Sequence, residues 1–187
     1  MNRKTRTLIF IAMYVALAVV LDYVSELIPF LQMPQGGNIN LALISVFMAS
    51  YHLGWKNGII TGLLWWLVGF MMGQNRWYLT PIQYILDYIG PAIVCGFAAA
   101  FPKVSKVSNV FTGVTVTMVL KYFIHTLAGV YFWFPETTYA GSAASWIYSL
   151  GYNLWYNLAT LIVCVILVPI LVKALNRGSN KFVGYKG

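Results

Sequence analysis

Apolar segments about 20 residues long follow one another along this chain, and the short turns between them carry most of its basic residues. A helix needs about 20 apolar residues to cross the hydrocarbon core of a bilayer. Only 9% of the residues are charged, whereas soluble domains contain about 25%. The chain is therefore predicted to be an all-α integral membrane protein. Its net charge of +8 does not indicate nucleic-acid binding, because the basic residues do not gather on one soluble face.

A single membrane domain of six helices accounts for residues 1–187. The predicted spans cover residues 8–28, 40–53, 58–72, 81–101, 110–134 and 145–175, and the second is short enough to be tilted or to cross only part of the membrane. Residues 29–39 form a loop rich in proline and glycine. The first apolar run is longer than that of a signal peptide and lacks a small-residue cleavage site, so we expect it to be retained as a helix.

Lysine and arginine are distributed unevenly between the two sides of this arrangement. Ten of the twelve share one side: Arg3, Lys4, Arg6, Lys56, Lys103, Lys106, Lys173, Arg177, Lys181 and Lys186. Arg76 falls on the other side, and Lys121 lies within the fifth span. Basic residues favour the cytoplasmic side of a membrane. Both termini are therefore predicted to be cytoplasmic, in a multi-pass protein of the cell membrane.

Small residues repeat every four positions in two places. Gly54, Gly58 and Gly62 form one stripe, and Ala12 and Ala16 form another in the first span. Such stripes let helix backbones approach closely within a membrane. We interpret the glycine stripe as internal packing. The alanine stripe either packs internally or docks another membrane subunit.

Two ionisable side chains fall within the fifth span. Lys121, His125, Gly129 and Trp133 are spaced by four residues, so they share one helix face. Ionisable groups inside a membrane helix are costly and usually face a cavity or a partner. This face is therefore predicted to point into the protein, with Lys121 near the middle of the membrane.

Polar groups in other spans lie at a depth similar to that of His125. With a rise of 1.5 Å per residue, His125, Asp87, Tyr148 and Asn153 fall within roughly 5 to 13 Å of the outer ends of their helices. Asp22 also lies in the outer half of its span. The match in depth fits a pocket open to the outside, and it equally fits a buried structural network.

The residue types indicate which ligand such a pocket would bind. A carboxylate beside aromatic rings favours a flat cation, through charge pairing and cation–π attraction. His125 and Asn153 offer hydrogen-bond donors and acceptors to the edge of a heteroaromatic ring. Cys95 and Cys164 lie in apolar runs and have no metal-ligand spacing, so neither a metal nor another cofactor is expected. A compact cationic or amine-bearing aromatic molecule is the predicted ligand.

Four motifs resemble the thiamine-specific substrate-binding (S) components of energy-coupling-factor (ECF) vitamin transporters. The motifs are Met33-Pro34-Gln35-Gly36-Gly37, Leu86-Asp87-Tyr88, Lys121 to His125 continuing through Gly129 to Trp133, and Trp146-Ile147-Tyr148-Ser149-Leu150 with Asn153. The resemblance covers nearly the whole chain. It implies a six-helix bundle that captures thiamine with high affinity from the extracellular side and is not an enzyme.

The resemblance also implies roles for individual residues. Asp87 would bind the aminopyrimidine and offset the positive charge of the vitamin. His125, Tyr148 and Asn153 would line the pyrimidine ring, and Trp133 would stack on the thiazolium ring.

Further ligand contacts follow from the same resemblance. Tyr88, Lys121 and Gly129 would take secondary positions in the binding site. Asn40 stands where some relatives carry a glutamate, which bears on recognition of the hydroxyethyl end. A second stacking ring would come from Trp77 or Tyr78, and the sequence does not choose between them.

The implied partners are an ECF module, made of a transmembrane coupling subunit and two ATPases, and the lipid bilayer. The sequence contains no G-x-x-x-x-G-K-[ST] motif, so ATP hydrolysis would be supplied by the module. Ala12 and Ala16 match the face that such proteins apply to the coupling subunit. We expect the loop over residues 29–39 to close over bound vitamin, because Gly36 and Gly37 permit backbone movement.

Other functions remain open at this point. A membrane enzyme would use His125 and Asp87 as acid and base, but no catalytic signature accompanies them. A proton-coupled carrier of a cationic aromatic molecule would use Asp22, Asp87, His125 and Lys121 as a relay. An S component for another vitamin or a thiamine precursor, and a structural membrane protein without a ligand, are further alternatives.

Overall fold

The computed structural model describes residues 2–74, 77–101 and 107–176. The described residues are folded into helices joined by short loops, with one isolated β-bridge between Gln32 and Asn38. The helices are α1 (Arg3–Leu27), α2 (Ala42–Leu53), α3 (Trp55–Met71), α4 (Pro81–Tyr84), the π-helix η3 (Ile85–Ile89), α5 (Gly90–Gly96), α6 (Val107–Phe132) and α7 (Ala143–Asn176). Three short 3₁₀ turns complete them: η1 (Pro29–Leu31), η2 (Pro34–Gly36) and η4 (Ala98–Ala100). The all-helical prediction is confirmed.

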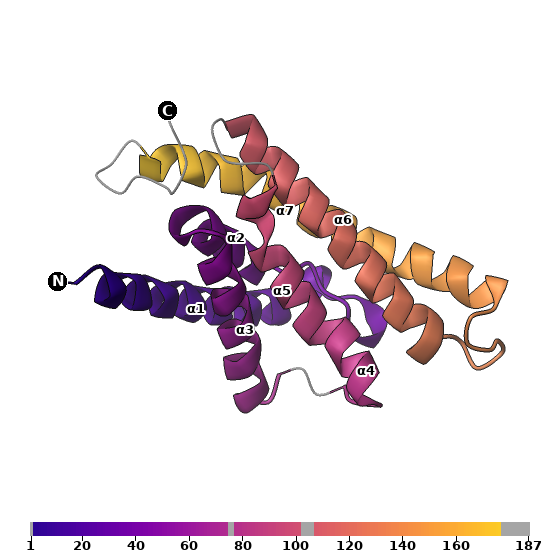
Figure 1. Ribbon diagram of the computed structural model, residues 1–187. Helices are drawn as coiled ribbons and strands as arrows, with labels where there is room; N and C mark the ends of the chain where they lie inside the picture. The colour runs from indigo at the N-terminus through magenta and orange to yellow at the C-terminus, as the bar shows by residue number, and fades with distance from the viewer. Residues whose placement is uncertain (1, 75–76, 102–106, 177–187) are drawn as a thin grey trace.

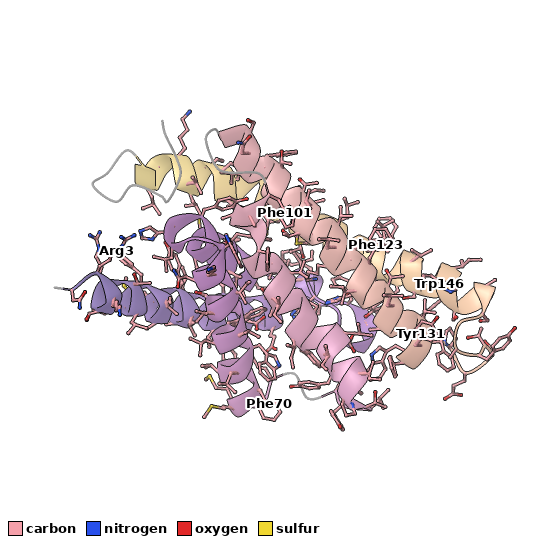
Figure 2. The ribbon with its side chains drawn as sticks, in the orientation of Figure 1. Arg3, Phe70, Phe101, Phe123, Tyr131 and Trp146 are labelled. Atoms are coloured by element: carbon pink, nitrogen blue, oxygen red, sulfur yellow. The ribbon has the colours of Figure 1, made fainter. Side chains whose placement is uncertain are left out.

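The surface of the described part has the character of a membrane protein. Three of its helices, α1, α6 and α7, are long and apolar enough to cross a membrane. Large apolar side chains such as Phe70, Phe123 and Tyr131 project from the outside of the helices (Figure 2), and each is about half exposed. An outer surface of this kind is stable against lipid tails and not against water.

The bundle is built around a short central helix. Residues 42–51 of α2 are all buried, and Phe47 and Tyr51 are fully enclosed in the core cluster. A helix that is apolar on every side belongs in a core, and one of 10–14 residues is too short for an ordinary crossing. Figure 1 shows α6 and α7 as a long antiparallel pair, with α1, α2, α3 and α5 packed to one side of it.

The fourth predicted span is helical but not continuous. Thr80 caps α4, since its hydroxyl accepts a hydrogen bond from the amide of Gln83 at 3.1 Å. The chain then forms the π-helix η3, whose closing bond runs from the amide of Gly90 to the carbonyl of Ile85. Pro91 follows immediately and lacks the amide that a regular α-helix would pair with residue 87. The interruption therefore comes from the sequence itself.

Glycine allows a close contact between helices α3 and α5. Gly58 and Gly62 of α3 face Gly96 and Ala92 of α5, and a Cβ atom on Gly62 would lie 2.5 Å from the carbonyl oxygen of Ala92. Internal packing is thus confirmed for these two positions. Gly54 differs, because it joins α2 to α3 with a φ of +88° and has no neighbour in reach. Its role is backbone conformation, and the expected three-residue packing stripe is wrong at that position.

The orientation in the membrane and the number of crossings stay predictions. Arg76, Lys103, Lys106, Arg177, Lys181 and Lys186, on which the orientation partly depends, lie outside the described residues. The first turns of α1 and the last turns of α7 lie toward the same end of the molecule (Figure 1). This arrangement agrees with the expectation that both termini share one side.

Candidate ligand-binding cavity

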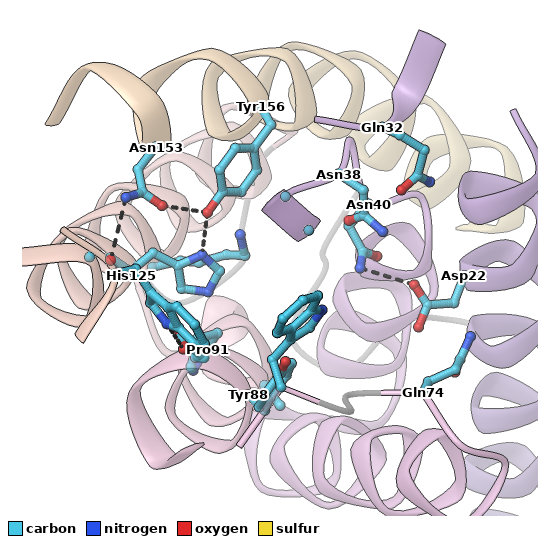
Figure 3. A pocket seen from close by; sticks show the side chains of 18 of the residues that line it. Asp22, Gln32, Asn38, Asn40, Gln74, Tyr88, Pro91, His125, Asn153 and Tyr156 are labelled. Carbon is cyan, nitrogen blue, oxygen red and sulfur yellow. Dashed lines mark hydrogen bonds between the residues drawn. The ribbon is translucent and has the colours of Figure 1, made fainter. Parts of the chain in front are cut away.

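A cavity of about 820 Å³ lies between α1, α3, η3, α5, α6, α7 and the loop that follows α1. Its size falls within the range of about 300–1,000 Å³ that small-molecule sites occupy. Every residue predicted to contact a ligand lines it: Asn40, Asp87, Tyr88, Lys121, His125, Gly129, Trp133, Tyr148 and Asn153. The polar groups of separate helices therefore surround a hollow space (Figure 3) and do not form only a solid buried network.

The charge of this cavity is opposite to that of the chain. The sequence has twelve basic and four acidic residues, yet three of the four acidic residues, Asp22, Glu26 and Asp87, line the cavity. Lys121 is the only lysine or arginine among the described lining residues. Carboxylates in a site with aromatic walls attract a cation. The lining of this cavity therefore favours a cationic ligand.

Asp87 is held in place by two donors. Its Oδ2 atom accepts hydrogen bonds from Gln83 Nε2 at 2.5 Å and from Trp133 Nε1 at 2.7 Å. Gln83 is fully buried, and its Oε1 atom accepts a bond from the amide of Leu79 at 2.8 Å. The carboxylate and the indole of Trp133 therefore form one unit, anchored to the start of α4. Oδ1 of Asp87 takes no part in these bonds.

Of the two rings predicted as a second stacking partner, Trp77 and Tyr78, the structure places one at the cavity. Trp77 lines the cavity and packs edge-to-face on Trp133, with ring centroids 6.1 Å apart. Tyr78 is not among the described lining residues and packs against Tyr84 at 5.8 Å. The structure therefore favours Trp77 over Tyr78.

A hydrogen-bonded chain fixes the tautomer of His125. Asn153 donates its amide to the carbonyl of Ser149 at 2.9 Å, which turns its Oδ1 toward Tyr156. The Tyr156 hydroxyl has one hydrogen, which it donates in a hydrogen bond to that Oδ1 at 2.5 Å. It must therefore accept a hydrogen bond from the N–H of His125 Nδ1, 2.7 Å away. In the neutral imidazole Nε2 is then an acceptor, and it has no hydrogen-bond partner within the described chain. Figure 3 shows this chain on one wall of the cavity.

Lys121 is paired and buried at the base of the same wall. Its Nζ atom donates to Asn157 Oδ1 at 2.7 Å and lies 5.4 Å from the centre of the Tyr156 ring. Gly129 lies two turns further along α6, where a Cβ atom would collide with the Ser149 hydroxyl. Its missing side chain thus allows α7 to approach α6, which is a packing role beside its place on the cavity wall.

The loop after α1 covers part of the cavity and is fastened to α7. The hydroxyl of Tyr152 accepts a hydrogen bond from the amide of Gly37 at 3.1 Å and donates to the carbonyl of Pro34. A Cβ atom on Gly37 would lie 3.0 Å from the Tyr156 ring, so this residue must be small. Tyr148 continues the aromatic row, stacked on Tyr152 at 6.1 Å. Movement of the loop as a lid stays a prediction.

A second polar cluster lies on the opposite wall. Asp22 accepts hydrogen bonds from Asn40 Nδ2 and from Trp65 Nε1, each at 3.1 Å. Gln74, at the end of the α3 segment, also lines the cavity here. Asn40 itself carries no charge, but it is bonded to a carboxylate, that of Asp22 in α1.

Several lining or supporting residues were not singled out from the sequence. They are Gln83, Tyr156, Asn157, Tyr152, Trp65 and Gln74. Gln83 precedes Asp87 by four residues, and Tyr156 and Asn157 follow Asn153 by three and four, so each shares a helix face with a predicted residue. That spacing was the available signal. No comparable signal marks Trp65 or Gln74.

The alanine stripe lies away from the cavity. Ala12 and Ala16 are exposed on α1 and line a shallow apolar groove with Val15, Val19, Val20, Leu64 and Val68. Internal packing, one of the two interpretations of this stripe, is therefore wrong for these residues within the described chain.

Comparisons with known proteins agree with this geometry. A family model described as "Thiamine transporter protein (Thia_YuaJ)" matches residues 8–180. The thiamine transporter ThiT of Bacillus subtilis is 37% identical over 162 residues, which are 81% of this chain and 82% of that protein. The riboflavin transporter RibU of Lactococcus lactis is 28% identical over 141 residues, 71% of this chain and 64% of that protein. The fold matches a solved structure of ThiT from Listeria monocytogenes with a TM-score of 0.70 and 24% identity, covering 95% of this chain and 97% of that one.

Proposed function

We propose that this chain, which belongs to the thiamine transporter protein family, captures thiamine outside the cell as the substrate-binding (S) component of an energy-coupling-factor transporter. The family is one of transporters and not of enzymes. The chain is accordingly a membrane protein. Its placement as a six-span protein of the cell membrane, with both termini in the cytoplasm, is part of the proposal.

The single observation that carries the proposal is the charge of the cavity. Three of four acidic residues line a site in a chain of net charge +8, and tryptophan and tyrosine rings form much of its wall. Thiamine is a permanent cation with two flat heteroaromatic rings. It gains both charge pairing and cation–π contact in such a site.

Asp87 and His125 supply the polar contacts in this proposal. The Oδ1 atom of Asp87 accepts a hydrogen bond from the amino group of the pyrimidine, and the carboxylate also offsets the cation. Nε2 of His125 is an acceptor without a partner in the described chain, so it suits the second N–H bond of the same amino group. Tyr148 and Asn153 border the same ring.

The aromatic contacts come from Trp133 and Trp77. The bond to Asp87 fixes the Trp133 indole, so this ring is already oriented to stack on the thiazolium. Trp77 stands edge-on to it and closes the outer side. Tyr88 borders the same space, and Lys121 with Gly129 supports the wall from α6. A preorganised site of this kind binds with high affinity because little ordering remains to be done.

Transport would be driven by other subunits. The exposed groove around Ala12 and Ala16 is apolar and shallow, which suits close contact with a membrane helix of a coupling subunit. ATP hydrolysis would come from the ATPases of the ECF module. The loop over residues 29–39 would open to admit thiamine and close over it.

A binding titration tests the proposal. Purified protein in detergent is titrated by calorimetry with thiamine, riboflavin, biotin and pyridoxine. We expect tight one-to-one binding of thiamine alone. Trp133→Ala and His125→Ala should each weaken it by a factor of roughly 10 to 100, with an unchanged helical spectrum. Preference for riboflavin, or wild-type affinity in both variants, would reject the proposed ligand or the proposed site.

A further inference from the structure

Gln83 of α4 lies behind the wall of the cavity and bonds to two parts of the site at once. It is fully buried and is not among the described lining residues. Its Nε2 atom donates to Asp87 Oδ2 at 2.5 Å and also to the carbonyl of Trp77 at 3.2 Å. Its Oε1 atom accepts from the amide of Leu79 at 2.8 Å. Both hydrogens of the side-chain amide and its oxygen are therefore used.

The segment over residues 77–79 depends on these bonds for its position. Its side chains Trp77, Tyr78 and Leu79 are 61%, 60% and 52% exposed, so their burial contributes little to holding the segment in place. Exposed segments with few buried contacts are those that open most easily. Two backbone groups of this segment nevertheless bond to a side chain in the core. Gln83 therefore ties an exposed part of the cavity wall to the protein interior.

The same bonds connect Trp77 to the carboxylate proposed to pair with the ligand. Asp87 Oδ2 also accepts from Trp133 Nε1 at 2.7 Å, and the Trp77 ring packs edge-to-face on that of Trp133. With Gln83, these residues form a closed network in which each residue contacts the next. Groups in one such network strengthen one another and do not act independently. A ligand that fixes Asp87 would therefore also fix Trp77.

Helix capping alone does not account for Gln83. Thr80 and Gln83 have the spacing of a capping box, in which the glutamate or glutamine bonds back to the amide of the N-cap residue. Here Oε1 takes the amide of Leu79, one residue earlier. Glutamate would serve a capping box equally well, but it has no N–H to donate to Asp87 and Trp77. Capping therefore does not explain the donor side of this amide.

We propose that Gln83 is a positioning residue that couples Asp87 to Trp77, so that a cation bound at Asp87 holds the Trp77 ring against the ligand and slows its release. The inference rests on the proposed function, in which Asp87 and Trp77 both contact thiamine. It gives a residue outside the described lining a role in the lifetime of the complex.

Hydrogen exchange at the Leu79 amide tests the coupling, because this amide bonds to Gln83. Exchange is followed by mass spectrometry in wild-type protein and in Gln83→Met, each free and saturated with thiamine. We expect thiamine to slow exchange at Leu79 roughly tenfold or more in the wild type and not in the variant. Wild-type protein that binds no thiamine would reject the proposed function. Binding without slower exchange at Leu79 in the wild type would reject the coupling alone, whether or not Gln83→Met folds.

Dissociation rates separate this coupling from a purely structural role. Thiamine release is followed by stopped-flow tryptophan fluorescence in wild type, Gln83→Met, Trp77→Ala and the double variant. We expect Gln83→Met to release thiamine roughly tenfold faster, with little change in association rate. The double variant should release it much more slowly than the product of the two single effects requires, because the substitutions disrupt one network.

Asn57→Leu is the matched control for these rates. The Asn57 side-chain amide also bonds to the backbone, at 2.7 Å from the carbonyl of Leu53, and Asn57 lies outside the described lining. This variant should release thiamine at the wild-type rate. Effects of Gln83→Met and Trp77→Ala that simply multiply in the double variant would overturn the proposal, since Gln83 would then act on Asp87 alone.

Discussion

Single polar residues act in this cavity through the neighbours that orient them. His125 presents an acceptor at Nε2 only because its Nδ1–H donates a hydrogen bond to the Tyr156 hydroxyl, which is itself oriented by its bond to Asn153. Without that chain, either ring nitrogen could carry the proton. Tyr156 therefore determines whether Nε2 of His125 acts as a hydrogen-bond acceptor or as a donor.

Removal of the Tyr156 hydroxyl tests this dependence. Tyr156→Phe keeps the ring above Lys121 but leaves Nδ1 of His125 unpaired, so the tautomer is no longer fixed. We expect thiamine affinity to fall roughly tenfold with little change in melting temperature, by calorimetry and thermal unfolding. Tyr139→Phe is the matched control, because Tyr139 is exposed and lies outside the described lining. Equal affinities of Tyr156→Phe and wild type would contradict the proposed proton arrangement.

The residues that could be predicted from the sequence are those that an apolar helix does not ordinarily tolerate. Asp87, His125 and Lys121 are conspicuous in membrane spans, because their burial is costly without a partner. Tyr156 and Gln83 are not conspicuous, since uncharged polar and aromatic residues occur at many positions in such helices. Their functions depend on which atom faces them, and a pattern of residue types does not contain that information.

At the scale of elements, the π-helix η3 connects sequence most directly to the site. It carries Asp87 and Tyr88 and is followed by Pro91. A π-turn contains one residue more than an α-turn and rotates the residues before it relative to those after it by about 100°. The direction of Asp87 into the cavity therefore depends on this irregular turn.

Pro91→Ala restores a backbone amide and tests the role of the π-helix. With the amide present, the segment can adopt a regular α-helix, which would turn Asp87 away from Trp133. We expect unchanged or increased melting temperature and a loss of thiamine affinity of roughly tenfold or more. Pro169→Ala, at the proline inside α7, is the control and should bind normally. Normal binding by Pro91→Ala would show that the turn does not orient Asp87.

The proposed docking groove on α1 is separate from the cavity, so substitutions there should distinguish docking from ligand binding. Ala12→Trp and Ala16→Trp fill the groove while leaving the cavity lining intact. We expect thiamine uptake by cells that also express an ECF module to fall to background, and calorimetric binding to stay at the wild-type value. Ile162→Trp, on an exposed face of α7, serves as the control for bulk. Full uptake by both alanine variants would exclude this groove as the docking face.

At the scale of the whole molecule, the helices could be predicted from the sequence, but the way in which they pack around one another could not. Length and hydropathy predicted an all-helical chain, and three of the described helices are long and apolar enough to cross a bilayer. The number of crossings stays a prediction. Length and hydropathy did not show that α2 is the enclosed centre of the bundle, or that Trp65 and Gln74 line the cavity. Those features follow from how helices pack around one another, through contacts such as Gly62 against Ala92. Packing partners are not encoded in the composition of any single span.

The complete cavity favours retention of a ligand, and in the proposed mechanism the ECF module would supply the energy for release to the cytoplasm. The charged groups and aromatic rings of the cavity are held in place by Gln83, Asn153 and Tyr152. We therefore expect thiamine to dissociate slowly from this site. We expect liposomes containing this chain alone to accumulate no thiamine above binding stoichiometry, even under an imposed pH gradient. Addition of a purified ECF module and internal ATP should start uptake of radiolabelled thiamine. Accumulation driven by the pH gradient alone would instead identify a proton-coupled carrier, with Asp22, Asp87, His125 and Lys121 as the relay to examine.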